Sequence, residues 1–378
     1  MLKGVQLSVM IGPLVPIPVP RDVLDALESA TVTVKDVGTS GFELVFQVGK
    51  RSPLQTLFLL AGGQSVPVLR VVLVALLGGQ PEVLIDGVVT HHEIAPGSEG
   101  RGGTLKLMGE DLTAMMNLLD FSGLPYPACP AEARVLLMLA KYAVLGVVPL
   151  VIPSVLIDVP IPTGRIPGQK GTDLAYLRGL ADDVGYVFYL EPGPLPGMSV
   201  AYWGPQLKIG VPQPALNVDM DAYTNVETLS FSFSSQQNEV PIVYHYEELT
   251  KLPIPIPIPP ITPLSPPLGL LPPIPLRLSQ VPLSDDLSKR SLPQAVMIGL
   301  AKAAQAAEAV TGRGTLDVLR YGRVLKARQL VGVRGAGDAF DGLHYVKSVT
   351  HQIKRGQFKQ SFELSRNALL SLTPRVPV

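Results

Sequence analysis

Three pairs of adjacent carboxylates are the first residues in this chain to consider for catalysis. They are Asp182-Asp183, Glu247-Glu248 and Asp285-Asp286. General acid–base chemistry and glycoside hydrolysis need two carboxylates that face one substrate, whereas adjacent residues of a helix or a strand point in different directions. We therefore interpret all three pairs as solvated surface charge.

The histidines and glycine motifs do not form a site either. His91 and His92 would lie on opposite faces of a strand, without a third ligand at a zinc-binding spacing. His344 and His351 have opposite parity in a predicted strand and are interpreted as cross-strand or interface residues. Two segments lack the other residues of the loops that they resemble, namely Gly332-x-x-Gly335-x-Gly337 for a dinucleotide and Asp338 to Gly342 for calcium. We predict no catalytic residue, cofactor or metal.

The composition limits the possible partners. The chain has 378 residues with 31 basic and 31 acidic side chains, and this neutrality disfavours a surface that tracks nucleic acid phosphates. Its single cysteine, Cys129, is predicted to be a buried, inert thiol. No apolar run reaches the roughly 20 residues of a membrane-spanning helix, and the amino-terminal residues lack a signal-peptide pattern. We expect no specific nucleic acid binding, no direct membrane insertion, and folding in the cytoplasm.

The chain is apolar for a soluble protein. Hydrophobic residues make up 47% and charged residues 16% of the sequence, whereas about 25% charged residues is usual. The surplus apolar surface must be buried in a large core, between subunits, or in lipid. We favour burial between subunits, because an obligate interface resembles a domain core cut in half.

Residues 1–120 are predicted to form a first β domain. Its expected strands are β-branched runs separated by glycines, and they are Ala30 to Val37, Phe42 to Val48, Val68 to Leu76, Val83 to Ile94 and Thr104 to Met108. A short helix is expected to open at residues 109–112.

Residues 121–205 are predicted to form an inserted α/β module, because the period of the apolar residues changes there. Its expected elements are a helix from Ala131 to Val144 with Pro130 at its first position and Gly146 at its end, a helix capped by Thr172 or Asp173 and ended by Gly185, and a hairpin of residues 186–190 and 200–203.

Residues 206–251 and 312–370 are predicted to form a second, discontinuous β domain, followed by a tail at 371–378. In its last hairpin, buried and polar residues alternate with a period of two, and residues 354–357 supply the turn. Residues 227–234 alternate in the same way, and we expect their sheet partners after residue 312.

A proline-rich segment interrupts this domain at residues 252–311. Proline alternates with isoleucine over residues 253–259, so we expect polyproline II rather than helix or sheet interior. A stiff linker and a ligand for proline-reading domains are alternatives. Because isoleucine and leucine fill the spaces between the prolines, we favour a strap on an apolar protein surface. An alanine-rich helix is expected over residues 294–310, ended by Gly312.

The sequence of the carboxyl-terminal region resembles a known family. Residues 341–367, DGLHYVKSVTHQIKRGQFKQSFELSRN, are similar to the closing hairpin of baseplate hub proteins of contractile phage tails and contractile injection systems, the late control protein D family, related to the hub part of VgrG-type spikes. Weaker similarity is carried by Gly322 to Arg328, Val331 to Gly337, Thr172 to Leu177 and Tyr202 to Pro205. The resemblance spans most of the chain and is densest at residues 312–370.

This resemblance implies both a fold and a role. The fold would be mainly β, with two similar β-barrel (tube-like) domains, an inserted peripheral α+β module and the proline-rich strap. The role would be that of a structural protein and not an enzyme, a homotrimer that adapts a sixfold inner tube to a threefold spike. The implied partners are a separate spike protein, since eleven residues follow Asn367, the inner tube or a tube-initiator protein, and other baseplate proteins. The particle would be a phage tail or an injection system assembled in the bacterial cytoplasm.

Two alternatives of other classes are kept. A tail-tip peptidoglycan hydrolase would need a carboxylate pair in a cleft. A receptor- or carbohydrate-binding tail component would need exposed aromatic side chains, and the chain has 6% aromatics and a single tryptophan, Trp203. We predict assembly contacts in the strap and the last hairpin, and the residues are Ile254, Ile256, Ile258, Tyr345, Lys347, Phe358, Phe362 and Arg366.

Overall fold

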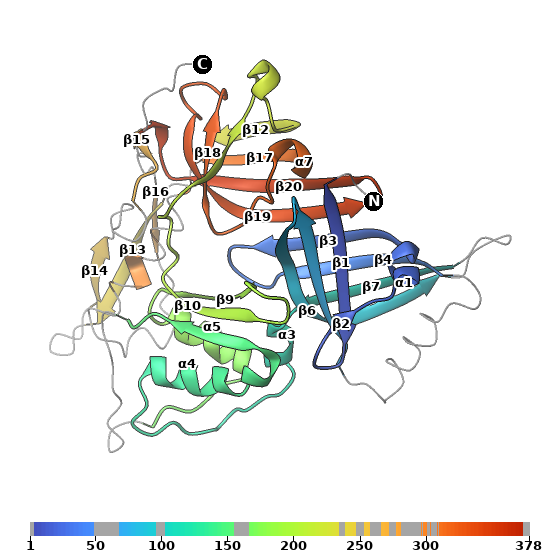
Figure 1. The fold of residues 1–378 in the computed structure, drawn as a ribbon. Coiled ribbons are helices and arrows are strands. Elements are labelled where there is room, and N and C mark those ends of the chain that lie inside the picture. The colour runs from blue at the N-terminus through green and yellow to red at the C-terminus, as the bar shows by residue number, and fades with distance from the viewer. Residues whose placement is uncertain are drawn as a thin grey trace.

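One large sheet runs through most of the computed structural model (Figure 1). The structure describes residues 4–48, 68–95, 103–154, 166–233, 239–246, 253–257, 266–271, 277–280, 296, 298–300, 303, 308 and 310–372. Within these residues the sheet has thirteen strands, and its main path follows the order β12, β17, β20, β19, β3, β4, β7, β6, β5, β1, β2. Strands β18 and β11 are attached beside β19.

The first β unit comes from the amino-terminal third of the chain. Its elements are β1 (Val5–Gly12), β2 (Ile17–Pro18), α1 (Arg21–Ala26), β3 (Leu27–Lys35), β4 (Gly41–Val48), β5 (Arg70–Leu77), β6 (Gln80–Ala95), β7 (Gly103–Asp111) and α3 (Thr113–Met116). All five predicted strands are present, and the short helix follows the last of them, starting a few residues later than predicted. Strand β1 was not predicted. It pairs antiparallel with β5 over its whole length.

The second β unit contains the predicted closing hairpin. Its elements are β11 (Gln213–Asn217), η2 (Asp221–Tyr223), β12 (Thr228–Phe233), β17 (Val310–Asp317), α7 (Val318–Tyr321), β18 (Leu330–Arg334), β19 (Gly342–Lys354) and β20 (Gln357–Arg366). Strands β19 and β20 are joined by Arg355 and Gly356, as predicted. The predicted inner residues of β20 are buried, and they are Phe358, Gln360, Phe362 and Leu364.

The two units share one strand order. In the first unit the neighbours are β3, β4, β7, β6, β5 and β1, and in the second they are β12, β17, β20, β19, β18 and β11. In both units, the third and fourth strands of this series form a hairpin. One difference is the last pair, which is antiparallel between β1 and β5 but parallel between β11 and β18. The predicted mainly β fold is confirmed, and the two units are similar in strand order.

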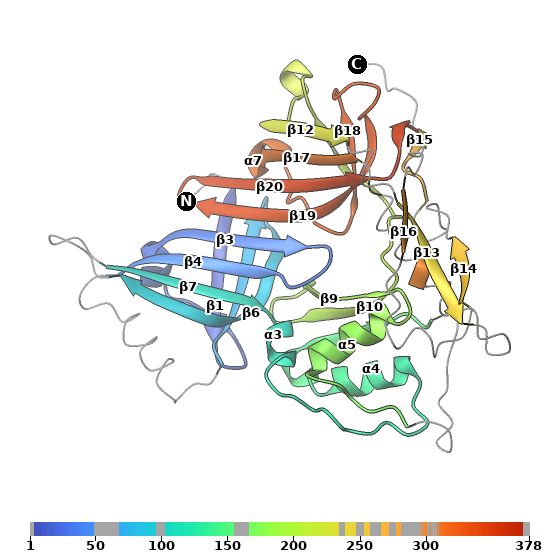
Figure 2. The ribbon, with the colours of Figure 1, turned by 180° about the vertical axis from the view of Figure 1, so that it is seen from behind.

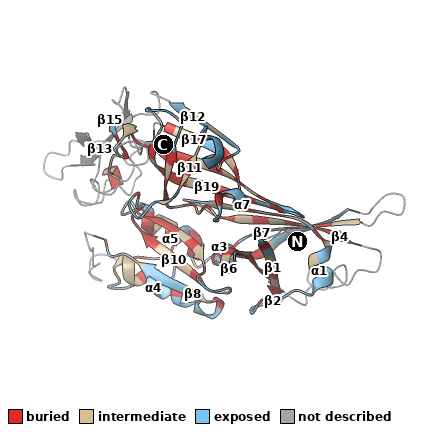
Figure 3. Cartoon of the chain, turned by 45° about the horizontal axis from the view of Figure 1, so that its top comes forward, coloured by how far each residue is buried: buried red, intermediate tan, exposed pale blue. Residues whose placement is uncertain are grey.

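A β-bulge lies at the same place in each unit. In β19 the extra residue is Lys347, because Val346 pairs with Leu364 while Ser348 pairs with Glu363. In β6 the extra residue is Thr90, opposite Gly109 and Met108 of β7. A bulge shifts the alternation of faces by one residue. In Figure 3, which colours the strands by burial, β19 alternates between buried and more exposed residues after its bulge, whereas the end of β6 is exposed throughout.

The bulge corrects one prediction from the sequence. His344 and His351 were expected on opposite faces because seven residues separate them. Lys347 adds a residue to the strand between them, and both side chains are buried, at 0% and 4% exposure. His344 packs against the Phe231 ring and His351 against the Phe358 ring.

The two units join through a seam between β19 and β3. Residues 348–354 of β19 pair antiparallel with residues 29–35 of β3, and the two strands lie side by side in Figures 1 and 2. One hydrophobic core extends through both units, with members such as Val32, Phe46, Leu316 and Phe362. The seam therefore makes one continuous sheet from two similar units.

The module packs below the first unit in Figure 1. Its elements are α4 (Ala131–Ala140), η1 (Ala143–Leu145), β8 (Val147–Val151), α5 (Asp173–Asp182), β9 (Val187–Pro192) and β10 (Ser199–Gly204). Thr172 caps α5, as predicted, by accepting a hydrogen bond from the Ala175 amide. Helix α4 is shorter than predicted, and Pro130 precedes it as its N-cap. Strand β8, which was not predicted, pairs parallel with β10.

The core of the module surrounds Trp203. This side chain is fully buried and contacts the Tyr186 ring edge-on. Cys129, predicted to be buried, is half-buried beside this core. No helix in the described ranges has the length and apolar character needed to cross a membrane.

The described parts of the strap contain strands. Strand β14 (Pro253–Pro257) pairs antiparallel with β13 (Glu239–Tyr246), which also pairs parallel with β16 (Arg277–Gln280). Residues 253–257 are thus extended at a sheet edge rather than unpaired polyproline II, and an edge is the position in a sheet that tolerates proline. Strand β13 pairs within this small sheet and not with strands after residue 312. A further strand, β15 (Gly269–Leu271), pairs with β21 (Leu369–Ser371).

The predicted alanine-rich helix ends earlier than expected. Residues 296, 298–300 and 303 are helical, and Ala303 is fully buried. Val310 already belongs to β17, so the helix does not reach it. Gly312 does not end the helix but lies within that strand, where a Cβ atom would come within 2.6 Å of the Phe231 ring.

Candidate assembly surface

The outer side of the large sheet carries rows of small polar side chains. On β12, β17, β20, β19 and β3, each of these residues alternates with a buried or less exposed residue. We call this surface the polar face, and its residues are Thr228, Ser230, Ser232, Thr311, Arg313, Thr315, Lys359, Ser361, Glu363, Ser348, Thr350, Gln352, Ser29, Thr31 and Thr33. The polar face crosses the seam, because Thr350 of β19 lies opposite Thr33 of β3.

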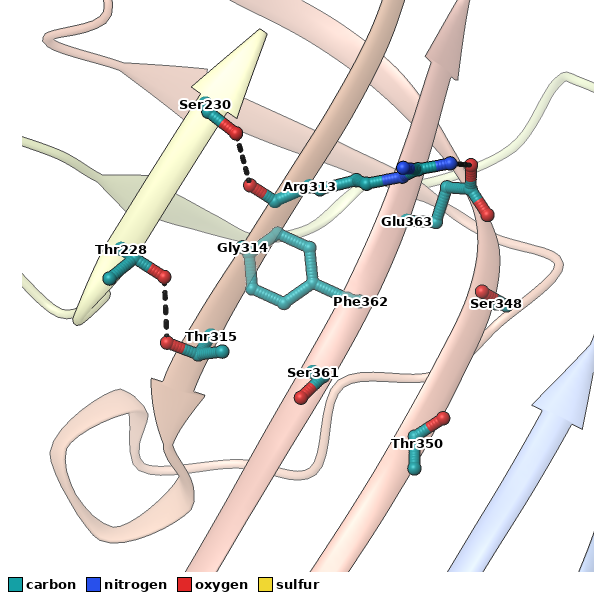
Figure 4. Close-up of a pocket in the computed structure, with 10 residues that line it drawn as sticks. All are labelled: Thr228, Ser230, Arg313, Gly314, Thr315, Ser348, Thr350, Ser361, Phe362 and Glu363. Atoms are coloured by element: carbon teal, nitrogen blue, oxygen red, sulfur yellow. Dashed lines mark hydrogen bonds and ion pairs between the residues drawn. The ribbon is translucent and has the colours of Figure 1, made fainter.

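Hydroxyl groups on neighbouring strands hold the polar face together. The Oγ1 atoms of Thr228 and Thr315 are 2.8 Å apart, and those of Thr33 and Thr350 are 3.2 Å apart across the seam. A shallow groove of about 430 Å³ lies on this face over β12, β17, β20 and β19. Figure 4 shows the Phe362 ring next to Gly314, with hydroxyl groups on the strands around it. Most of the residues that line the groove are polar, and the Phe362 side chain is only 4% exposed.

The charges of this surface occur in opposite pairs. Arg313 lies 3.2 Å from Glu363, and Lys359 lies 2.7 Å from Glu227. On the first unit, Lys106 lies 2.9 Å from Glu43. These pairs are solvent-exposed, so each contributes little to stability. Their effect is to leave the surface close to neutral, with no field that would attract polyanions.

The residues considered first for catalysis do not meet in the structure. Among the described residues, no group of three histidine, cysteine, aspartate or glutamate side chains is placed to hold a metal ion. His91 and His92 are exposed on β6, and Asp182 is exposed at the end of α5. The other two carboxylate pairs, Glu247-Glu248 and Asp285-Asp286, lie outside the described residues.

The glycine and aspartate motif after β18 forms a turn. Gly335 and Gly337 have φ angles of 83° and 92°, a region that favours glycine. The Asp341 carboxylate accepts a hydrogen bond from the Ala336 amide and closes this turn. Both the dinucleotide and the calcium patterns are thereby accounted for by the connection between β18 and β19.

The buried histidines are neutral members of the core. Burial lowers the pKa of His344 to about 3 and that of His351 to about 4. The amide of Gln360 lies 3.1 Å from Nδ1 of His351 and also bonds the backbone of Leu325. Neither imidazole is accessible to a substrate, and we assign both to packing.

Charged side chains converge at the bulge of β19. The Lys347 ammonium lies 2.7 Å from the Glu308 carboxylate, which also binds the buried Lys208 ammonium at 2.7 Å. Burial alone would raise the pKa of Glu308, but the two lysines hold it below its ordinary value. The Lys347 carbonyl accepts a hydrogen bond from the Asp36 amide of the first unit. This cluster fixes the point at which β19 changes neighbours from β18 to β3.

Arg328 connects all three parts of the chain. It belongs to the second unit, where its amide donates to the Val346 carbonyl. Its guanidinium carbon lies 3.9 Å from the centre of the Tyr189 ring in the module. Its Nε atom donates to the Asp36 carbonyl of the first unit at 3.4 Å. The residue holds a left-handed φ of 66°, which a side chain other than glycine adopts only when its surroundings stabilise it.

A buried ion pair attaches the module to the first unit. Arg70 of β5 makes two hydrogen bonds to Asp86 of β6, at 2.7 and 2.6 Å, and both side chains are almost fully buried. The same guanidinium donates to the carbonyls of Leu145 and Gly197 in the module and of Leu14 in the first unit. All but one of the five N–H groups of this guanidinium therefore donate hydrogen bonds within the chain.

Comparisons with known proteins identify the fold. No protein-family model matches the sequence, and no curated protein is significantly similar to it. The tail protein from Neisseria meningitidis MC58 is 14% identical, with a TM-score of 0.61 over 96% of this chain and 97% of its own. The 43 kDa tail protein of prophage MuSo2 from Shewanella oneidensis is 12% identical, with a TM-score of 0.57 over 96% of this chain and 98% of its own. This chain has the fold of phage tail proteins.

The tail-protein fold also occurs in a larger solved assembly. A chain of the half-lidded Francisella PdpA-VgrG complex is 10% identical, with a TM-score of 0.56, and covers all of this chain. This chain spans 60% of the length of that chain. The likeness in fold therefore includes both β units and the module.

Within the tail-protein fold, most of the residues predicted for assembly in the last hairpin already make contacts inside the chain. Phe358 and Phe362 lie in the common core, and Tyr345 packs against Leu268 and Leu330. Arg366 is buried and donates to the carbonyls of Asp341 and Leu370. Of the five hairpin residues, Lys347 has the most exposed side chain, at 33%. The assembly role of these residues stays a prediction.

The structure does not test the predicted assembly role of the three isoleucines in the strap. Ile254 and Ile256 belong to the edge strand β14, where the structure describes the backbone alone, and Ile258 lies outside the described residues. Their assembly role also stays a prediction.

The sequence reasoning missed Arg70, Asp86 and Arg328. Arg70 was visible as a charge within an apolar, β-branched run, and a charge in such a run signals a buried partner. Arg328 gave no local signal, because its partners Asp36 and Tyr189 lie far away in the sequence.

Proposed function

We propose that this protein is the structural hub of a contractile tail or injection-system baseplate, and that it acts as a homotrimer. The observation that supports this best is the pair of β units with one strand order, joined by a seam in one sheet. Three such chains supply six similar units. A ring of six units meets a sixfold tube on one side while its chains keep threefold symmetry for a spike on the other.

The polar face suits a structural role. A continuous surface of hydroxyl groups and paired charges provides neither a catalytic cluster nor an excess of positive charge. It fits a wall along which other molecules pass, or a contact between subunits, better than it fits a binding site for nucleic acid. We infer that the protein is not an enzyme.

The partners follow from this role. A separate spike protein would bind the threefold side, and an inner tube or tube-initiator protein the sixfold side, with other baseplate proteins around them. The particle would be a phage tail or an injection system, assembled in the bacterial cytoplasm. The domain boundaries at residues 120, 205, 251 and 312 remain part of this proposal.

Light scattering on the purified protein, alone and co-expressed with a spike candidate, tests the proposal. Three chains of 40.3 kDa give about 121 kDa. We expect this mass and an additional increase with the spike. A monomer under both conditions would contradict the hub proposal.

A further inference from the structure

Among the described residues, two of the unpaired edges of the large sheet resemble the two sides of the seam between β19 and β3. One is the outer edge of β12, which pairs with β17 on its other side. The other belongs to residues 91–95 of β6, which pair with β7, while β5 ends opposite Val88. An unpaired edge presents backbone donors and acceptors that another strand can satisfy.

The seam within the chain shows what pairs with such edges. By strand order, β6 corresponds to β19, and β12 corresponds to β3. Because the bulge residues Thr90 and Lys347 are equivalent, the residues that follow them in β6 and β19 can be matched one by one. After its bulge, β19 leaves β18 and pairs with β3. The end of β6 and the outer edge of β12 are therefore the two sides of a second seam, left open in the single chain.

We propose that residues 91–95 of one copy pair antiparallel with β12 of a second copy and repeat between chains the seam between β19 and β3. The register follows from the intrachain seam, in which Thr350 lies opposite Thr33 and His351 opposite Val32. We replace each residue of β19 by its equivalent in β6 and each residue of β3 by its equivalent in β12. The resulting pairs are His92 with Phe233, Glu93 with Ser232, Ile94 with Phe231, and Ala95 with Ser230.

The exposure of the side chains agrees with this register. Ile94 is 38% exposed in the single chain, whereas its equivalent His351 is 4% exposed beneath the seam with β3. Phe233 is likewise 44% exposed. Pairing covers both apolar side chains on the inner side of the sheet. On the outer side it places Glu93 beside Ser232, so the polar face continues from one copy to the next.

The edge of β12 also lacks the features that prevent pairing. Its six residues, TLSFSF, include no proline and no charged side chain. At the other end of the same sheet, β2 has two residues, one of which is Pro18. Short edge strands and prolines block the addition of another strand, whereas a flat, uncharged edge favours it. The second copy is therefore the partner that we assign to β12.

The closed ring rests on the proposed trimeric hub. Three copies contain six units, and six seams join them, of which three lie within chains and three between chains. The pairing of strands itself does not depend on the number of copies, so a separate experiment can test each statement.

Paired cysteines test the register. In a chain with Cys129→Ser, the double variant Glu93→Cys/Ser232→Cys is oxidised with diamide and analysed on a denaturing gel without reductant. Directly opposite residues of antiparallel strands approach closely enough for a disulfide. We expect most chains to become linked to one another. Thr33→Cys/Thr350→Cys is the positive control, which should close a disulfide within one chain, because the two hydroxyl oxygens are 3.2 Å apart.

The matched control is Glu93→Cys/Ser230→Cys, which shifts one partner by two residues on the same face. Equal or better linking of this variant would overturn the proposed register. An oligomer in light scattering without linking at 93 and 232 would overturn the pairing and leave the hub proposal intact. Linking with a mass other than that of three chains would support the pairing and overturn the trimer. A monomer that does not link would overturn both.

A second variant tests the contact without cysteines. Ile94→Lys places a charge where the pairing buries an apolar side chain, so we expect the dissociation constant of the oligomer to rise at least about tenfold. Ile17→Lys, at an edge residue that is 66% exposed, should leave it unchanged. Equal association of both variants, at unchanged circular dichroism, would contradict the proposal.

Discussion

Arg328 stacks on the ring of Tyr189, with its guanidinium carbon 3.9 Å from the ring centre, and in this position it also reaches the backbone of Asp36. One side chain thus contacts the module and both β units. We expect Arg328→Ala to lower the free energy of unfolding by about 1–2 kcal/mol, because a partly desolvated cation–π contact and its packing are lost.

Urea denaturation followed by circular dichroism measures this loss, and Arg323→Ala provides the control. Arg323 is exposed five residues earlier in the same connection. An equal, small change in both variants would show that Arg328 does not hold the three parts together.

The buried pair of Arg70 and Asp86 gives the largest expected loss. Replacing either residue by alanine leaves the other charge buried without its partner, at a cost of about 3–5 kcal/mol. Removing Lys106 from its exposed pair with Glu43 should change the free energy of unfolding far less, because water and salt screen an exposed pair. Chemical denaturation of the three single variants compares these values. If Asp86→Ala proved as mild as Lys106→Ala, the buried pair would not anchor the module.

The two buried histidines predict acid sensitivity. Their folded pKa values, about 3 for His344 and about 4 for His351, lie below the ordinary 6.5, so the unfolded chain binds protons first as the pH falls. The free energy of unfolding is therefore expected to be greatest above pH 6.5 and to fall toward pH 4, by up to about 1.4 kcal/mol per pH unit for each histidine.

Denaturation between about pH 7.5 and about pH 5 measures this slope. His351→Gln should reduce it, because a neutral amide replaces the titrating ring. A slope that His351→Gln left unchanged would contradict the assignment.

Two glycine substitutions should act in opposite directions. A Cβ atom at Gly109 would lie 2.3 Å from the Val88 carbonyl oxygen and 2.3 Å from the Phe42 ring, so we expect Gly109→Ala to destabilise the first unit by about 1–3 kcal/mol. Gly179 lies within α5, where an added Cβ would meet no atom within 4 Å other than its own helix backbone, and Gly179→Ala should stabilise by about 0.5–1 kcal/mol. Thermal unfolding of both variants tests the opposite signs.

The strap provides a prediction about assembly alone. Replacing Ile254, Ile256 and Ile258 by serine should reduce the yield of oligomer while the β content of the monomer stays the same, because apolar side chains between prolines suit a contact with protein surface. Light scattering and circular dichroism measure the two quantities. Unchanged oligomer mass and particle yield would rule out an assembly role for the strap.

The sequence predicted the elements with strong periodicity. The alternation in β20 and the cap at Thr172 were both read correctly, since period and capping are local properties of the chain. Strand β8 was missed because Pro149 interrupts its apolar run. An apolar run alone does not distinguish a strand from a loop. The alanine-rich segment was extended to Val310 because alanine favours a helix, whereas pairing with Arg366 and Phe233 places Val310 in a sheet.

The contacts that connect the units could not be predicted from the sequence. No sequence feature near Ser348 indicates that β19 pairs with β18 before its bulge and with β3 after it. The same holds for Arg328, which depends on residues nearly 300 positions away. Such contacts are set by tertiary packing, which overrides local preference.

The bulge at Lys347 also limits how this chain can change in length. Deleting this one residue would turn Ser348, Thr350 and Gln352 toward the core and expose Val349, His351 and Ile353, since one position inverts every later residue of a strand. Insertions and deletions between Val346 and the turn at Gly356 should therefore be accepted only in pairs. The same arithmetic applies after Thr90 in β6, so the lengths of the two hairpins are constrained even where their side chains are free to vary.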